Sequence, residues 1–256
     1  MVENKELSII DLIIDTHVGL KRQGPGSDEM TIKALSYIDG LQENSQILDI
    51  GCGTGWQTII LANNAPGNII GLDLFPNFVN VLNENAKSNN LQNRINGIVG
   101  SMENLPFNKE QFDLIWCEGA IDNIGFEKGL TYWYDFLKYN GYIAVTSPTW
   151  FTTEHPDEVN KFWLDAGSSG LDEISKNISV MQNIGYKFIA TFILPEKCWT
   201  DNYFNPREHA IQKLLEKYSG NSMVEGFIEN NRHEVELYSK YKQYYGYAFF
   251  IGKKYK

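Results

Sequence analysis

A short apolar run that leads into three alternating glycines, Leu48-Asp49-Ile50-Gly51-Cys52-Gly53-Thr54-Gly55, limits what this chain can fold into. The residues at 46–50 predict a buried strand, and the apolar spacing over 54–64 predicts a helix after it. Glycine is favoured where the backbone needs a positive φ or where another group approaches too closely for a Cβ atom. The stretch therefore predicts a strand, a tight turn and a helix, with a ligand against the turn.

The spacing of these glycines separates two kinds of ligand. In the dinucleotide-binding fingerprint the third glycine follows the second by three residues, whereas here the three alternate strictly. The carboxylate of Asp49 would oppose a pyrophosphate but favour a cationic ligand such as S-adenosylmethionine, which carries an ammonium and a sulfonium group. A second apolar run over 68–72 ends in Asp73, where a carboxylate can accept hydrogen bonds from both ribose hydroxyls. Together these features favour S-adenosylmethionine over a nicotinamide dinucleotide.

On these residues the chain resembles the class I S-adenosylmethionine-dependent methyltransferases, in particular the small-molecule branch similar to the ubiquinone and menaquinone biosynthesis methyltransferases (methyltransferase type 11). The resemblance covers residues 20–150 well and the remainder poorly. Within that range, residues 100–107 match the segment that holds the adenine, and 112–120 match the fourth strand and its loop. Residues 137–145 match the unit that closes the core.

The resemblance implies a fold, a cofactor and a set of contacts. The expected fold is α/β, with a Rossmann-like, mostly parallel seven-stranded sheet and helices on both faces. The expected cofactor is S-adenosylmethionine. The residues expected to bind it are Asp49, Gly51, Gly53, Thr54, Gly55, Asp73, Leu74, Ser101, Met102, Glu103 and Glu118.

We expect a single methyltransferase domain over residues 1–256, because strand and helix patterns alternate without a repeat or a low-complexity tract. Its parts are a helical cover over 1–44, a core over 45–194 and 244–256, and a helical insertion over 195–243. Relatives usually place a short hairpin where this insertion lies. Its aromatic residues are consistent with a substrate lid, an oligomer surface or ordinary packing, and Trp199 and Tyr203 are the rings expected to be least buried.

Composition and charge exclude several classes of protein. A net charge of −10 and a pI near 4.9 argue against a nucleic-acid substrate. The short basic pairs Lys21-Arg22 and Lys253-Lys254 are expected at the surface. No apolar run is long enough to span a bilayer and no signal peptide is recognisable, so we expect a cytoplasmic protein.

The positions of the cysteines and histidines predict neither a disulfide framework nor a metal site. The three cysteines are odd in number and far apart, which argues against a disulfide framework. No His, Cys or acidic set has the spacing of metal ligands, so no metal is expected. His17, His209 and His233 are expected to be packing or surface residues.

Methyl transfer from a sulfonium needs alignment and exclusion of water more than a dedicated catalytic residue. Residues that follow the fourth and fifth strands should surround the acceptor: Glu118, Asp122, Asn123, Thr149, Trp150 and His155. Two of these are candidate catalytic residues. His155 is a candidate general base, with an exposed surface position as the alternative, and Glu118 is either a base or a hydrogen-bond acceptor near the methionine end of the cofactor.

The sequence therefore favours a methyltransferase that acts on a small, apolar or aromatic metabolite. The alternative is a non-catalytic S-adenosylmethionine-binding protein with an assembly role. A nicotinamide-dependent dehydrogenase shares only the glycine-loop topology and fails on glycine spacing. We also expect a homodimer, because the insertion adds apolar surface.

Overall fold

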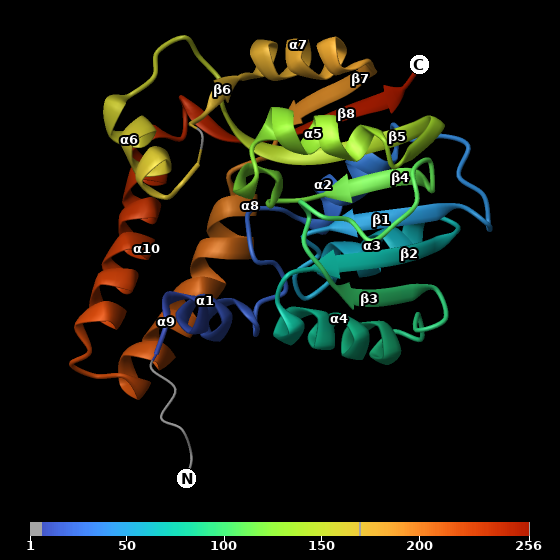
Figure 1. Cartoon of the computed structure of the whole chain (residues 1–256). Helices are drawn as coiled ribbons and strands as arrows, with labels where there is room; N and C mark the ends of the chain where they lie inside the picture. The colour runs from blue at the N-terminus through green and yellow to red at the C-terminus, as the bar shows by residue number, and fades with distance from the viewer. Residues whose placement is uncertain (1–6, 169, 256) are drawn as a thin grey trace.

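A computed structural model describes residues 7–168 and 170–255 as a sheet with helices on both faces (Figure 1). Residues 1–6 of the expected cover, together with 169 and 256, lie outside the described residues. The strands follow the order β3-β2-β1-β4-β5-β8-β7, with β6 paired to β5 off this path. Their bounds are β1 (Gln46–Ile50), β2 (Asn68–Asp73), β3 (Ile95–Val99), β4 (Phe112–Cys117), β5 (Leu137–Trp150), β6 (Asp172–Glu173), β7 (Tyr186–Ile193) and β8 (Tyr245–Lys254).

The strand order changes direction beside β1, and this places the ligand site. The chain runs outward from β1 to β2 and β3, then returns to β4 on the other side of β1. The five strands β1 to β5 are parallel, and only β8 runs antiparallel between β5 and β7. Because ligands of parallel sheets bind at the carboxyl ends where the order reverses, the loops after β1 and β4 should form the site. The predicted fold class is confirmed.

Helices cover the two faces in separate sets (Figure 1). On one face α2, α3 and α4 bury apolar residues such as Ala34, Leu61 and Leu82 in one core cluster. On the other face α5 and α7 bury Leu130, Trp133 and Met181 in a second cluster. The bounds are α2 (Asp28–Leu35), α3 (Trp56–Asn64), α4 (Pro76–Ser88), α5 (Phe126–Tyr134), α6 (Asp157–Asp165) and α7 (Ile174–Ile184), with a short 3-10 turn η1 (Ile121–Asn123) after β4.

The first helix packs on the insertion rather than on the sheet. Leu12 of α1 (Ile9–His17) is fully buried in a third apolar cluster with residues of α9 and α10. The insertion between β7 and β8 consists of α8 (Lys197–Trp199), η2 (Thr200–Phe204), α9 (Asn205–Lys217) and α10 (Ser222–Tyr241). Figure 1 shows α1, α9 and α10 together beside the carboxyl ends of the strands. No helix of the described chain is long and apolar enough to cross a membrane.

Two features of local structure differ from what the sequence pattern indicates, and each has a packing cause. The fifth strand continues to Trp150, beyond the matched residues 137–145, because β8 pairs with it as far as Tyr245. The side chain of Lys254, expected at the surface, is buried and donates to the carbonyls of Tyr134 at 3.0 Å and Leu137 at 2.8 Å. Sequence spacing cannot show either long-range contact.

The ring of Trp199 is also in an unexpected place. It is 1% exposed and stacks on Tyr238 with ring centroids 4.3 Å apart. Tyr203 is likewise buried. The expectation that these two rings are the least buried of the insertion is therefore wrong, because the short helix α8 turns inward against the sheet cluster.

We predict that Trp199→Ala lowers the free energy of unfolding by about 3 to 5 kcal/mol, because it leaves a large cavity in the core. Urea denaturation measures the change. Tyr139→Ala, which removes a ring that is 61% exposed, is the matched control and should change stability little. Equal stability of the two variants would show that Trp199 is not a core residue.

The carboxyl group of Asp49 is fully buried between β1 and α3. The hydroxyl of Thr58 donates to one oxygen at 2.6 Å, and the other oxygen has no hydrogen-bond partner among the described residues. Burial raises the pKa of Asp49 to about 8. The folded protein therefore keeps a proton on this group over a pH range in which the unfolded chain has lost it.

Because the folded state binds the extra proton, Asp49 should make the protein less stable as the pH rises from about 4 to 8. We predict that between pH 5 and 8 the parent loses about 3 kcal/mol of unfolding free energy relative to Asp49→Asn. Denaturant titrations of both proteins at four pH values test this. Parallel pH curves would contradict it.

Candidate functional site

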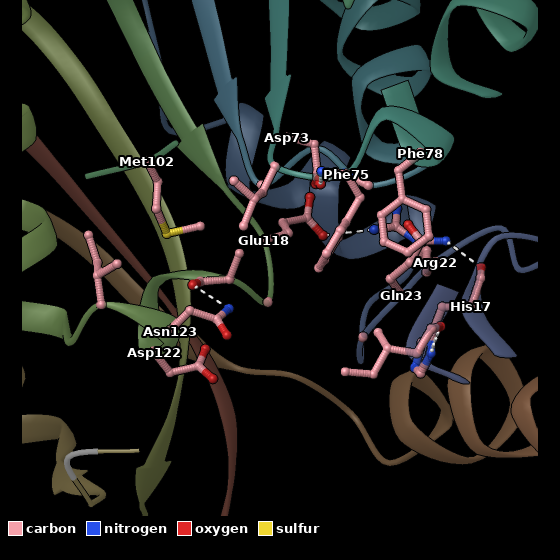
Figure 2. Close-up of a pocket in the computed structure, with 18 of the residues that line it drawn as sticks. His17, Arg22, Gln23, Asp73, Phe75, Phe78, Met102, Glu118, Asp122 and Asn123 are labelled. Carbon is pink, nitrogen blue, oxygen red and sulfur yellow. Dashed lines mark hydrogen bonds and ion pairs between the residues drawn. The ribbon is translucent and has the colours of Figure 1, made fainter. Parts of the chain in front are cut away.

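A cavity of about 530 Å³ opens at the carboxyl ends of the strands. Its walls come from the glycine turn after β1, the residues after β2, β3 and β4, the cover and the insertion. Figure 2 shows Asp73, Phe75 and Phe78 on one side of it, and Asp122 with Asn123 on another. The topological switch beside β1 is thus the place where the cavity forms.

The carboxylate of Asp73 is fixed at the cavity wall by two backbone amides. Gly53 donates to one oxygen at 2.8 Å and Phe75 donates to the other at 3.0 Å. Burial raises the pKa of Asp73 above its ordinary value. These bonds orient both oxygens and link the glycine turn directly to the end of β2.

The glycine turn needs glycine because of its neighbours as well as its backbone angles. At Gly51, where φ is +69°, a Cβ atom would lie 2.5 Å from the Cβ of Ala120. At Gly53, where φ is +54°, it would lie 2.0 Å from the side-chain oxygen of Gln23. The absence of a side chain at Gly53 therefore leaves room for Gln23 of the cover. Gly53 also lines the cavity.

Gln23 fastens the cover to the glycine turn. Its amide oxygen accepts from the backbone N–H of Thr54 at 2.9 Å, and its amide nitrogen donates to the Thr54 hydroxyl at 2.9 Å. The same nitrogen donates to the Leu20 carbonyl at 2.9 Å. One side chain thus ties the loop between α1 and α2 to the loop after β1.

Arg22 and Glu118 form a buried ion pair beside Gln23. The guanidinium lies 2.8 Å from one carboxylate oxygen, and the two side chains are 6% and 4% exposed. The other oxygen of Glu118 accepts from Thr31 at 2.7 Å and from the indole of Trp116 at 2.9 Å. The expectation that Arg22 is a surface residue is therefore wrong, because its charge is matched inside the fold.

These contacts bear on the expected role of Glu118. Both of its oxygens already accept hydrogen bonds, and the one that accepts from Arg22 is held by a permanent cation, which favours the ionised carboxylate. Glu118 lines the cavity. The geometry favours it as a residue that holds the wall in place, and a base role stays a prediction that no contact supports.

Eight of the residues expected to bind the cofactor line the cavity. They are Gly51, Gly53, Asp73, Leu74, Ser101, Met102, Glu103 and Glu118. Three others lie behind the wall, where Asp49 faces α3, Thr54 bonds to the cover and Gly55 begins the turn into α3. These three support the turn from behind, and direct contact with a cofactor stays a prediction for them.

His155 lies away from the described lining of the cavity. Its ring stacks on Trp150 with centroids 4.6 Å apart, and Nε2 lies 3.1 Å from the carbonyl oxygen of Thr152. Thr149 and Trp150 also lie outside that lining, since they belong to the extended β5. A general-base role for His155 stays a prediction, and its position gives no support to that role.

A second part of the lining, which we term the acceptor half, comes mainly from the insertion and the loop after β4. Its members are Asp122, Trp163, Tyr203, Glu234 and Tyr247. The sequence pointed to Asp122 and Asn123 as neighbours of the acceptor, and both line the cavity. It did not single out Trp163, Glu234 or Tyr247, which no local pattern distinguishes from other helix and strand residues.

Hydrogen bonds join the acceptor half to the first helix. Arg207 donates to the hydroxyl of Tyr203 at 2.8 Å and pairs with Glu234 at 2.6 Å. The Tyr203 hydroxyl lies 3.4 Å from Nε2 of His17. Burial lowers the pKa of His17 to about 4, so this imidazole is neutral at neutral pH.

Known proteins resemble the expected core of this chain in sequence. Residues 47–141 match a family model described as a methyltransferase domain. Erythromycin 3''-O-methyltransferase of Saccharopolyspora erythraea is 34% identical over 116 residues, which cover 43% of this chain and 37% of that protein. Phosphoethanolamine N-methyltransferase of Plasmodium falciparum is 24% identical over 229 residues, 85% of this chain and 84% of that protein. The chain thus spans little more than a third of the length of the first of these relatives.

Solved structures extend the similarity of the fold to nearly the whole chain. A methyltransferase from Geobacter sulfurreducens, solved with S-adenosyl-L-homocysteine, superposes with a TM-score of 0.80 at 19% identity, over 96% of this chain and 99% of that one. The sequence matches in the core confirm the predicted resemblance to S-adenosylmethionine-dependent methyltransferases, and the solved structure confirms the fold. Residues 47–141 are thus similar to a methyltransferase domain, and two solved structures with the same fold as this chain hold S-adenosyl-L-homocysteine, the product form of the expected cofactor.

Proposed function

We propose that this protein transfers the methyl group of S-adenosylmethionine to a small, apolar or aromatic metabolite. The observation that carries the proposal is one cavity with two chemically different halves. The glycine turn and the fixed carboxylate of Asp73 lie in one half, and the buried rings of the acceptor half form the other. Such an arrangement can hold a cofactor and an acceptor in line.

The residues of the first half fit the cofactor. The fixed carboxylate of Asp73 is suited to the ribose hydroxyls, and Ser101 and Met102 line the same cavity, where they would contact the adenine. Arg22 and Gly24 line the part of the cavity next to the glycine turn, where the methionine moiety would lie. When bound, the cofactor supplies an electrophilic methyl group on a sulfonium.

The chain's own residues would supply alignment and exclusion of water. Tyr203 and Tyr247 are 8% and 4% exposed, so these two rings of the acceptor half have little contact with bulk solvent. The relative named as an erythromycin O-methyltransferase supports a small-molecule acceptor. No observation favours the non-catalytic alternative.

Two measurements test this function. Isothermal titration with S-adenosylhomocysteine should show binding at one site per chain. A methyl-release assay with S-adenosylmethionine and a metabolite panel should then show turnover with at least one acceptor. Failure to bind the cofactor product would overturn the proposal, and binding without turnover on any acceptor would favour the assembly role instead.

We predict that Asp73→Ala weakens S-adenosylhomocysteine binding by about 1.5 to 3 kcal/mol, because it removes a hydrogen bond to a charged group. Since Asp73 also accepts from Gly53 and Phe75, Asp73→Asn is the more conservative partner variant and retains one oxygen for those amides. Titration calorimetry gives the affinities. Asp165→Asn is the control, because that carboxylate is 65% exposed and pairs with Lys161 on the same helix. Unchanged affinity in both Asp73 variants would contradict the ribose assignment.

A further inference from the structure

The acceptor half carries more negative than positive charge. Glu234 is neutralised by Arg207, which lies 2.6 Å away and also donates to the Asn231 carbonyl at 3.0 Å. Asp122 forms no ion pair with any residue of the described chain, and the hydroxyl of Tyr247 lies 3.5 Å from it. One carboxylate therefore faces the cavity without a cation to balance it.

Three aromatic side chains line the same space, and the guanidinium of Arg207 lies over the ring of one of them, Tyr203, 4.5 Å from its centroid. Trp163, Tyr203 and Tyr247 line the cavity and are each at least nine-tenths buried. Rings of this kind attract a cation that lies over their faces, most strongly when water is excluded. Carboxylates and aromatic rings together form the usual protein environment for an ammonium group.

Trp163 adds an independent sign that a polar molecule belongs here. Its indole N–H is buried and has no hydrogen-bond partner within residues 7–168 and 170–255. A buried donor left without a partner costs about 1 to 3 kcal/mol, so such groups usually meet a ligand or an ordered water. A ligand atom that accepts a hydrogen bond would satisfy it, whereas an ammonium group, which only donates, would not, so this donor indicates a second polar group on the ligand.

We propose, building on the methyltransferase function above, that the methyl acceptor is an apolar or aromatic amine, cationic in water, whose nitrogen binds to Asp122 among these three rings. An anionic acceptor is disfavoured, because Arg22 and Arg207, the two buried arginines of this region, are already paired with Glu118 and Glu234. A neutral acceptor would leave the charge of Asp122 unmatched in a shielded site.

The reaction balances with Asp122 as the first proton acceptor. The bound ammonium gives one proton to the carboxylate, which frees the nitrogen lone pair. That pair forms the new N–C bond as the S–C bond breaks, and the bonding electrons stay on sulfur as a thioether. The products are an N-methylammonium, S-adenosylhomocysteine and one proton, which leaves Asp122 for water.

The charge state of Asp122 is compatible with this role. Burial raises the pKa of Asp122 to about 6, and the nearby charge of Glu234 contributes in the same direction. The group is therefore mostly ionised at neutral pH and is a stronger base than an ordinary carboxylate.

The test compares three probes of similar size: 2-phenylethylamine, 2-phenylethanol and 3-phenylpropionate. Each is titrated calorimetrically into protein saturated with S-adenosylhomocysteine. We expect the amine to bind at least about tenfold more tightly than the alcohol, and the acid to bind most weakly. In Asp122→Asn the preference for the amine over the alcohol should fall by about tenfold or more.

Glu236→Gln is the matched control. It also removes one negative charge, but from a side chain on α10 that is 79% exposed. It should leave the preference for the amine unchanged. A preference in the parent protein for the alcohol or the acid, or no detectable binding of the amine, would overturn the inference without any variant. Because cofactor-product binding is measured first, loss of that binding would instead count against the methyltransferase function.

Discussion

The ion pair between Arg22 and Glu118 joins the N-terminal helices to the edge of the sheet where the parallel strands end. Both side chains are almost fully buried, and Thr31 and Trp116 satisfy the remaining capacity of the carboxylate. Removal of one partner from such a pair typically costs about 3 to 5 kcal/mol, because the other charge stays buried. The pair therefore holds the cover in one position, and Gly24 and Pro25 become part of the cavity wall.

The insertion depends on that cover in turn. The side chain of Asn202 donates to the Gly26 carbonyl at 2.8 Å, and the Gly26 amide donates to the Cys198 carbonyl at 3.3 Å. On the other side Leu12 of α1 is buried against α9 and α10. Segments from opposite ends of the chain thus form one helical unit over the carboxyl ends of the strands.

The separation of contacting residues along the chain explains which features could be predicted from the sequence. The glycine turn and the placement of Asp73 at the end of a strand each depend on a short run of residues, and the structure shows both local conformations as expected. The burial of Arg22 depends on a carboxylate 96 residues further along the chain, so local polarity suggested the surface instead. The inward turn of Trp199 likewise depends on Tyr238, which lies on a distant helix.

In the candidate site, too, the features that could be predicted from the sequence are local ones. Asp122 was identified because it directly follows a core strand, and strand ends converge in a parallel sheet. His155 follows a strand as well, but the antiparallel partner β8 extends that strand past the cavity, and no local pattern near 155 reveals the pairing. Tyr247 reaches the cavity from β8 itself, the strand that displaced His155. The one antiparallel strand in the sheet therefore brings Tyr247 into the cavity lining and pairs with the end of β5 that precedes His155.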